Sequence, residues 1–499
     1  MKKIIIYLPL CGLLLASCDA MLDVNPSDKY STATFWADEE QYDAGLIGCY
    51  NSLYDSQNFF NAETEMVTPN AKAYNESNGT DGIAKGAALS TTVLFQNFWR
   101  SSYRSIGRAN TFLDQIDHAP FDEAKRNQMK GEALFIRALY YSYLANHFGG
   151  VPLILSTPDN AAQGKLPRNK KEEVVDQIIK DLTLAASLLK TAHSSSDIGR
   201  VTKGAALALK ARILLYNEQW AEAAKAAKEV IDLNVYGLFP NYRGMYLLEN
   251  ENNEEVIFDI QYKAPYYKHE LDNAIVMLNR PAPLKDLVDA YLMTDGKSIS
   301  ESSLYDPSNP YENRDPRLHQ TVVCIGYPYN GKITQPSNVV TTGFGLKKMT
   351  TYTDNTTTSV TAGNSEVNLI VLRYAEVLLT YAEALNEANS FPDSEVYWAL
   401  NTIRKRPTVE MPDIASGLTK GEMKDVIRLE RRIELAGEGL YLMDIRRWKI
   451  ADVVNNGPIY NYQGIEIEKR AFNKDRDYLW PVPEVEMQEN ANLEQNPGW

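Results

Sequence analysis

Residues 201–233 read VTKGAALALKARILLYNEQWAEAAKAAKEVIDL. Apolar side chains recur in this stretch at spacings of three and four, which predicts two helices joined by a tight turn at residues 217–219. Most of these side chains are alanine, which lets two helix backbones approach closely, and one large ring, Trp220, stands where the second helix turns back. A helical pair of this kind cannot bury its apolar face alone. We therefore expect a fold in which further helices stack on this one.

The hairpin resembles a tetratricopeptide unit, which has roughly 34 residues in a helix–turn–helix arrangement. An ordinary antiparallel helix pair in an α-helical domain is the alternative. Helical periodicity is also found from about residue 37 and over residues 92–116, 128–147, 171–189, 369–387, 394–406 and 420–436. Periodicity is weak between residues 236 and 368, where VIFDI at 256–260 is the best strand candidate. The expected fold class is mainly α, with tetratricopeptide-type helical pairs, long loops and a few short strands.

The composition is that of a globular protein with an acidic surface. The chain has 499 residues, of which 44% are hydrophobic and 23% charged, enough to bury a sizeable core. Its formal net charge is −14, and it becomes 49 − 65 = −16 once a signal segment carrying Lys2 and Lys3 is removed. An acidic protein is a poor partner for a nucleic-acid backbone. The 30 tyrosines favour a surface that stacks on sugar faces, although most tyrosines simply pack in helix faces.

The N-terminus predicts export and a lipid anchor. Residues 1–17, MKKIIIYLPLCGLLLAS, have the pattern of a secretory signal and are too short to cross a bilayer of about 30 Å. The sequence LASC at 15–18 resembles a bacterial lipobox, which predicts that Cys18 carries acyl chains such as palmitate; a plain cleaved signal is the alternative. Acyl chains would hold the protein at a membrane without crossing it. Cys49 and Cys324 then remain, and the sequence leaves open whether they pair.

Catalytic motifs are weak in this sequence. It contains neither HExxH nor GxSxG, and its five histidines are isolated from one another. A GxxxxGK spacing occurs at 326–332, but Ile333 replaces the Ser or Thr that would hold magnesium. A glycosidase needs only two carboxylates across a cleft, so a surface glycosidase stays an alternative. We expect no enzyme activity, no cofactor and no metal site.

The C-terminal third carries a family resemblance. The segments that carry it are ERRIELAGEG at 430–439, DIRRW at 444–448, YLWPVPE at 478–484 and QNPGW at 495–499, with FGGVPL at 148–153, RDPR at 314–317 and RYAEVLL at 373–379. Together with the lipobox, they resemble the SusD/RagB family of outer-membrane nutrient-binding lipoproteins over nearly the whole chain. One departure is LYLM at 440–443, where the family often places a basic residue before its Asp.

The motif residues have a physical interpretation as scaffold rather than as ligand contacts. Arg431, Arg432 and Glu434 on one helix can form charge-assisted pairs with Asp444 and Arg447 on the next. The two prolines at 481 and 483 predict an extended tail.

The resemblance implies a helical lid on the outer membrane, facing outward, which binds glycans and hands them to a SusC-like TonB-dependent transporter. Capture of peptides or other nutrients is the alternative within the family. The ligand site is expected in loops outside the repeats, where rings stack on sugars and amides bind hydroxyls. The candidates, chosen by loop placement, are Tyr74, Asn75, Asn78, Trp99, Tyr305, Tyr311, Tyr329 and Tyr352. Trp99 opens a helix, which favours a place in the core.

The expected boundaries follow from these patterns. A signal peptide at 1–17 and a lipidated tether at 18–36 precede a single domain at 37–499. Within that domain, helical pairs are expected at about 92–233 and 369–448, a loop-rich ligand-binding portion at about 55–91 and 236–368, and an extended tail at 470–499.

Overall fold

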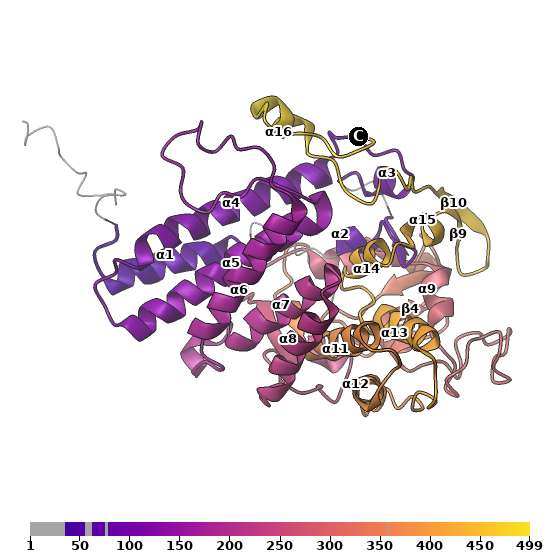
Figure 1. Ribbon diagram of the computed structural model, residues 1–499. Helices are drawn as coiled ribbons and strands as arrows, with labels where there is room; N and C mark the ends of the chain where they lie inside the picture. The colour runs from indigo at the N-terminus through magenta and orange to yellow at the C-terminus, as the bar shows by residue number, and fades with distance from the viewer. Residues whose placement is uncertain (1–34, 55–61, 75–77, 358) are drawn as a thin grey trace, which may run out of the picture.

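The helical hairpin at residues 201–233 forms as its sequence predicts. The computed structural model describes residues 35–54, 62–74, 78–357 and 359–499. In it, α7 (Lys203–Tyr216) and α8 (Trp220–Asp232) pack against each other, with Glu218 in the left-handed region at the turn between them (Figure 1). Thr202 caps α7 by accepting a hydrogen bond from the backbone N–H of Ala205.

The other long helices stack on this pair in chain order. They are α4 (Val93–Ile116), α5 (Glu123–Phe148), α6 (Lys171–Leu188), α11 (Tyr374–Ala388), α12 (Ser394–Arg404) and α13 (Lys420–Glu434). Each of α4 to α8 packs on the next, α8 then packs on α11, and α11 carries both α12 and α13 (Figure 1). The first helix, α1 (Glu39–Asn51), lies against α4 and α5. The predicted mainly α architecture is confirmed.

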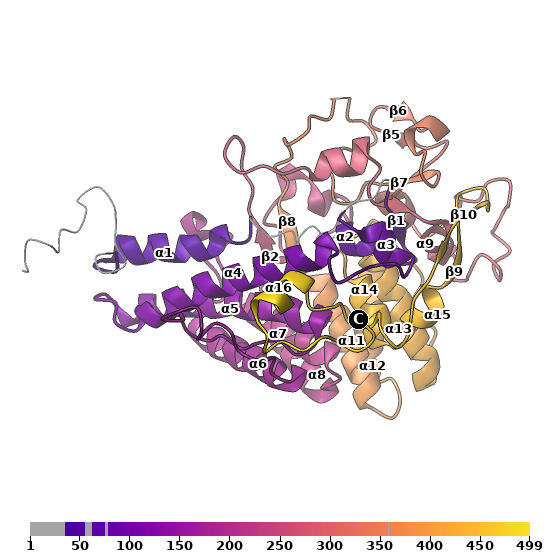
Figure 2. The same ribbon diagram turned by 90° about the horizontal axis from the view of Figure 1, so that it is seen from above.

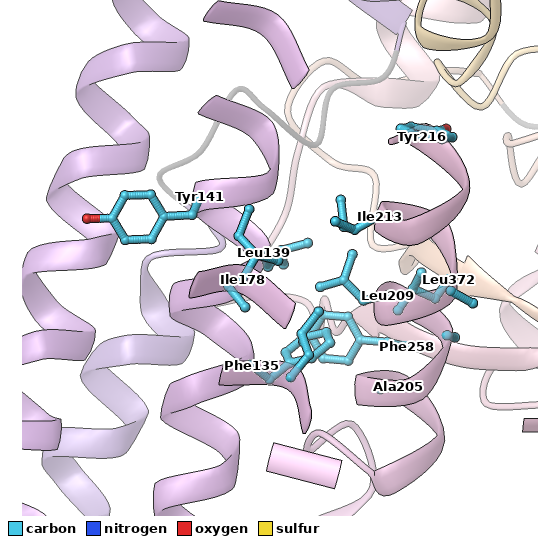
Figure 3. Packing of buried hydrophobic residues seen from close by; sticks show 14 of the residues in the cluster. Phe135, Leu139, Tyr141, Ile178, Ala205, Leu209, Ile213, Tyr216, Phe258 and Leu372 are labelled. Carbon is cyan, nitrogen blue, oxygen red and sulfur yellow. The ribbon is translucent and has the colours of Figure 1, made fainter. Parts of the chain in front are cut away.

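The core lies where these helices meet a pair of strands. Phe135 of α5 and Ile178 of α6 point toward Leu209 of α7, and Phe258 packs edge-on against Phe135 with 4.9 Å between ring centroids (Figure 3). Ala205 is fully buried in the same layer. The small side chains of α7 and α8 let the helices approach, while the aromatic rings fill the space on either side.

One predicted helix begins later than its periodicity indicates. Helical order was expected from residue 369, but Leu369–Arg373 is a strand, β8, and α11 begins at Tyr374. The strand pairs antiparallel with β2 (Val256–Ile260), the strand candidate that the sequence did identify. A run of apolar residues suits a buried strand as well as a helix, and its distant partner decides between them.

The other strands are short and form two-stranded pairs. They are β1 (Ala71–Lys72) with β3 (Ala282–Pro283), β4 (Val322–Cys324) with β7 (Phe344–Leu346), β5 (Pro328–Tyr329) with β6 (Lys332–Ile333), and β9 (Gly457–Tyr460) with β10 (Glu466–Arg470). Seen from above, β5, β6 and β7 lie on one side of the molecule and α6, α8 and α12 on the other (Figure 2). The GxxxxGK stretch is thus a hairpin, with its turn at Asn330 and Gly331.

Short helices connect these parts. The α-helices are α2 (Ala62–Glu65), α3 (Thr80–Ala84), α9 (Lys285–Ala290), α10 (Arg317–Thr321), α14 (Tyr441–Arg447), α15 (Ala451–Val454) and α16 (Glu484–Glu489). The 3₁₀ turns are η3 (Ser195–Asp197), η4 (Gly244–Tyr246), η5 (Leu248–Asn250) and η7 (Pro336–Asn338), and η6 (Asn273–Met277) is a π-helical turn. The tail after residue 470 contains turns at 474–479, 491–492 and 497–498 and one helix, α16, which begins directly after Pro483.

The motif helix α13 builds a buried ionic network. Glu434 accepts hydrogen bonds from Arg317, Arg373 and Arg406, and all four side chains are buried. Burial acts to raise the pKa of Glu434, but the arginines outweigh it and hold the pKa at about 2. The network joins α13 to α10, to β8 and to the segment after α12.

The expected pairs of the motif residues form in part. Arg431 contacts Asp444, 3.2 Å from Nε to Oδ2, and Arg447 forms ion pairs with Asp444 and with Glu383 of α11. Arg432 instead bonds Asn70 and Asp286 and lies over the Tyr441 ring of α14, 4.9 Å from its centroid, and Glu434 has the partners named above, so neither residue forms an ion pair with Asp444 or Arg447. The scaffold interpretation fits every one of these contacts.

The two cysteines of the described residues do not pair with each other. Cys49 and Cys324 are both free and buried, and they belong to separate hydrophobic clusters. Across the described residues, the helices are each too short or too polar to serve as a membrane-crossing segment.

Candidate functional site

A short antiparallel ladder brings two loops to one edge of the molecule. Ala71 pairs with Pro283 and Lys72 with Ala282. In an antiparallel pair, the residues after Lys72 and those before Ala282 leave the ladder at the same end. The chain toward Tyr74 and the chain coming from Arg280 therefore lie next to each other, although more than 200 residues separate them in the sequence.

A buried carboxylate ties these loops together. Oε1 of Glu63, on α2, accepts a hydrogen bond from Nη2 of Arg280 at 2.6 Å and another from Nδ2 of Asn78 at 3.2 Å. Glu63 is 4% exposed, whereas the Arg280 side chain keeps 27% of its surface in solvent. Charge-assisted bonds of this kind are about twice as strong as neutral ones, so Glu63 fixes where the guanidinium and the amide lie.

The backbone around Asn78 is held from the other side by α4. Asn78 and Gly79 both adopt left-handed conformations, with φ of 53° and 90°. The Asn78 carbonyl accepts a hydrogen bond from the backbone N–H of Leu94, in the first turn of α4. A Cβ on Gly79 would lie 2.2 Å from the methyl group of Thr92, so this close approach requires glycine.

Exposed apolar side chains lie on the chain segments that lead to this polar cluster. Tyr74 is 45% exposed, and Met277 and Leu278, just before Arg280, are 63% and 41% exposed. We call the set formed by Glu63, Tyr74, Asn78, Met277, Leu278 and Arg280 the ladder-end surface. It offers a ring and a flexible thioether for apolar contact, an amide with both donor and acceptor, and a guanidinium that donates. This combination suits a ligand that has both CH faces and hydroxyl or carbonyl groups.

Two of the predicted tyrosines support this surface from below. Tyr329 and Tyr352 are each 8% exposed and form a cluster with Val323 and Val339. Val276, which lies next to Met277 in the π-helical turn η6, packs on the same cluster. The Tyr329 hydroxyl lies 3.2 Å from Oγ1 of Thr350, and the Tyr352 hydroxyl donates to the Ser359 carbonyl. These rings therefore position the segment that carries Arg280, and little of either ring reaches solvent.

Two other predicted tyrosines belong to a different cluster. Tyr311 is half-buried and packs edge-on against Phe344 and Tyr327, with ring centroids 5.8 Å and 6.1 Å away. Tyr327 in turn stacks on His319 at 4.3 Å. Tyr305 is half-buried close to Tyr311, since the two hydroxyls interact electrostatically. The structure does not bring these two residues to the ladder-end surface.

The remaining predicted residues lie elsewhere. Trp99 is 4% exposed, packs perpendicular to Phe148 with 5.2 Å between centroids, and lines a cavity of about 370 Å³ between α4 and α16. Asn75 and the predicted lipidation residue, Cys18, lie outside the described residues.

Sequence reasoning missed the two charged residues of the surface. Glu63 and Arg280 lie in stretches without clear periodicity, and neither belongs to a motif. The one available signal was their place in the sequence, since Glu63 and Arg280 lie in or beside the Asn-rich and Tyr-rich loops that were expected to bind the ligand. Their meeting depends on the pairing of β1 with β3, which no local pattern indicates.

Comparisons with known proteins agree on one family. The family model described as "SusD family" matches residues 254–499, and the one described as "Starch-binding associating with outer membrane" matches residues 21–215. A SusD-like protein, P2, of Formosa agariphila is 26% identical, with 100% of both chains covered.

Solved structures show the same fold. A SusD-like carbohydrate binding protein of Bacteroides fragilis is 28% identical and superposes with a TM-score of 0.83, covering 92% of this chain and 100% of that one. A second SusD-like protein of Bacteroides fragilis is 27% identical, with a TM-score of 0.80 over 95% of this chain and 100% of that one. Two family models that together span most of the chain, relatives that match it from end to end and a shared fold all agree, and the chain belongs to the SusD family.

Proposed function

We propose that this protein binds glycans at the ladder-end surface, at the outside of the outer membrane, and delivers them to a SusC-like TonB-dependent transporter. Two observations carry the proposal: the exposed Tyr74 ring follows the strand that pairs with the segment after Arg280, and Glu63 holds both the Asn78 amide and the Arg280 guanidinium in place. The matching solved structure that is named for carbohydrate binding supports the choice of glycans.

The chemistry of the surface fits a sugar in two ways. One face of a pyranose ring is lined by C–H groups, and a tyrosine ring can cover it and remove it from water. The hydroxyl groups at the ring edge need donors and acceptors, which the amide and the guanidinium supply. A surface with one exposed ring and a few polar groups should bind a single sugar unit weakly, with a Kd of about 1 mM, which corresponds to about −4 kcal/mol. Longer glycans that touch Met277 and Leu278 as well should bind more tightly.

The membrane anchor and the transporter partner rest on other observations. The LASC sequence ending at Cys18 supports acylation, and a family model that matches residues 21–215 is described by association with the outer membrane. An acyl anchor leaves the folded chain free to move over a transporter, which suits a protein that collects ligand without cleaving it. Glycan binding without catalysis also agrees with how the matching solved structure is described.

A binding screen tests the proposal. The purified protein without its signal segment is titrated by calorimetry with a panel of polysaccharides and, in parallel, with a mixture of peptides. We expect saturable binding to at least one glycan and a loss of that binding in Tyr74→Ala. The matched control is Trp398→Ala, which removes a ring of similar exposure, 41%, from α12.

The outcomes separate the alternatives. Binding to peptides alone would assign the same surface to peptide capture. Release of reducing sugar from a bound glycan would identify a glycosidase. Glycan binding that survives Tyr74→Ala would place the site elsewhere on the chain. Co-purification of the full-length lipoprotein with a transporter barrel from native membranes tests the proposed partner.

A further inference from the structure

An ion pair joins the two ends of the chain that carries Tyr74 and Asn78. Lys72 is the last residue of β1, and Asp81 lies in the first turn of α3, so these two residues flank that part of the chain. The Lys72 ammonium lies 3.3 Å from Oδ1 of Asp81, across nine positions of the sequence. The pair therefore fixes where the loop begins relative to where it ends.

A carboxylate from the C-terminal hairpin holds this ion pair. Glu468, on β10, accepts a hydrogen bond from Lys72, and its Oε2 also lies 3.2 Å from Nζ of Lys85. Lys85 directly follows α3 and bonds Asp81 as well. We call Lys72, Asp81, Lys85 and Glu468 the loop-closing cluster. Their side chains are 18%, 26%, 41% and 8% exposed, so Glu468 is its most buried member.

An irregularity in the hairpin accounts for the burial of Glu468. Glu466 pairs with Tyr460 and Glu468 with Ile459, so β10 has one residue more than β9 between these pairs. Residues two positions apart share a face of a regular strand, whereas a bulge re-aims one of them. The Glu466 side chain is 47% exposed and that of Glu468 only 8%. The bulge thus separates two glutamates that a regular strand would place together.

Backbone contacts hold the hairpin next to the loop. Nη2 of Arg470 donates to the Ala71 carbonyl at 2.8 Å, and the backbone N–H of Ala471 donates to the Ala84 carbonyl at 3.3 Å. β10 is therefore bonded both to β1 and to α3, beside which it runs (Figure 1). These acceptors are uncharged and do not depend on Glu468. A change of Glu468 should accordingly leave the hairpin in place and act on the loop.

The charge of Glu468 balances the cations around it. Burial acts to raise the pKa of Asp81, but the hydrogen bond from Lys85 and the charge of Lys72 outweigh it and lower the pKa below its ordinary value. Nε of Arg470 lies 3.6 Å from Oε1 of Glu468. Without the charge of Glu468, three cations would share the Asp81 carboxylate. Their mutual repulsion would loosen the hold on both ends of the loop.

We propose that Glu468 is a positioning residue for ligand binding, which holds Lys72 and thereby sets where the Tyr74 ring and the Asn78 amide meet the ligand. Glu468 does not belong to the ladder-end surface and acts through the loop-closing cluster. The inference rests on the proposed function of that surface, but the position of the Tyr74 ring can be measured without a ligand. Since three members of the cluster are partly exposed, dissolved salt should weaken its hold.

Fluorine NMR of the protein with 3-fluorotyrosine at position 74 tests the positioning directly. We expect a resonance that shifts or broadens in Glu468→Gln and, in the wild type, when NaCl is raised from about 20 mM to about 500 mM. Glu468→Asp, which keeps the charge, should give a spectrum close to that of the wild type. Glu466→Gln removes an exposed carboxylate from the same strand and should leave the spectrum unchanged.

Calorimetric titration with a neutral glycan found in the screen tests the effect on binding. Glu468→Gln should weaken binding about fivefold at low salt, and Glu468→Asp should restore most of the affinity. Salt should weaken binding by the wild type about threefold and have less effect on Glu468→Gln. Lys85→Gln, at a 41% exposed position, should weaken binding about twofold and keeps the test valid if Glu468→Gln does not fold.

The outcomes distinguish this inference from the proposed function. An unchanged fluorine signal in both Glu468→Gln and Lys85→Gln would overturn the positioning role, and so would Tyr74-dependent glycan binding of normal affinity in these variants. Equal effects of Glu466→Gln and Glu468→Gln would also overturn it, because the loss of any carboxylate from the hairpin would then be sufficient. A signal that moves as expected in a protein that binds no glycan would support the positioning role and contradict the proposed function.

Discussion

Arg280 donates a hydrogen bond of 2.6 Å to Glu63, across 217 positions of the sequence. The bond joins the segment before β3 to α2, and the same carboxylate oxygen accepts from Asn78. One buried acid thus holds both the guanidinium and the amide of the ladder-end surface. The geometry of this surface should depend more on Glu63 than on any of the residues that meet the ligand.

Glu63→Gln keeps the shape of the side chain and removes its charge. We expect the affinity for the glycan found in the screen to fall about tenfold, which corresponds to the loss of one charge-assisted hydrogen bond of about 1.4 kcal/mol. Calorimetric titration measures the effect, and Glu229→Gln, an exposed change on α8, is the control. An unchanged affinity in a folded Glu63→Gln protein would show that Glu63 does not organise the site.

Ala205→Leu tests the close approach of the stacked helices. Ala205 is fully buried in α7, so three additional carbons would push the neighbouring helix layers apart. Overpacking of this kind costs about 1–3 kcal/mol, and the midpoint of urea unfolding should fall accordingly. Ala221→Leu adds the same atoms at an exposed position of α8 and should change the free energy of unfolding by less than about 0.5 kcal/mol. Equal stability of the two variants would contradict a close approach of the helices at Ala205.

Acid should unfold the protein through its buried carboxylates. Burial acts to raise the pKa values of Glu383, Glu434 and Glu438, but their arginine partners outweigh it and hold each at about 2, below the ordinary value of 4.5. The unfolded chain therefore binds more protons than the folded one in this range, so the stability is complete above pH 4.5 and is lost as the pH falls toward 2.

Thermal unfolding followed from pH 7 to pH 3 measures this loss. Glu383→Gln should be less stable at pH 7, because it leaves Arg447 buried with half of its charge compensation, and its melting temperature should depend less on pH than that of the wild type. Glu222→Gln, exposed on α8, should follow the wild-type curve. Parallel curves for the wild type and Glu383→Gln would show that this carboxylate does not control acid stability.

The cysteines provide a chemical test of both the core and the anchor. Burial raises the pKa values of Cys49 and Cys324 to about 12, so neither should react with a thiol reagent while the protein is folded. Reductant should leave the melting temperature unchanged, since the two are not joined. After unfolding, protein isolated from its native membrane should show two reactive thiols. A third thiol would contradict the predicted N-terminal processing, in which Cys11 is removed with the signal and Cys18 carries lipid.

Local patterns were sufficient for the long helices and for β2, and insufficient for the other strands. The hairpin at 201–233 was found because its alanine stripe and its turn are encoded within about 34 residues. Leu369–Arg373 was missed because a short run of four apolar residues, 369–372, becomes a strand only through its pairing with Val256–Ile260.

The sequence indicated which loops form the proposed ligand surface, but not which of their residues reach it. Tyr74 and Asn78 were chosen for their place in a polar loop; Tyr74 is exposed and Asn78 bonds Glu63, whereas Tyr329 and Tyr352 are buried in a cluster on which Val276 packs. A sequence shows that a ring lies in a loop, but which face of the loop it occupies depends on packing partners far along the chain. Arg280 could not be chosen for the same reason, since its position follows from the register of β1 with β3.

The ladder of Ala71 and Lys72 with Ala282 and Pro283 has two residue pairs, and the loops that leave it do not contribute to the alanine seam of the helices. Substitutions near residues 74 and 280 would therefore change the proposed ligand surface and leave the packing of the stacked helices unchanged. Under this proposal, a few substitutions in two short loops would be enough for the protein to bind a different nutrient. Tyr329 and Tyr352 would limit these substitutions, because the turn at Asn273–Met277 must keep its packing on their cluster.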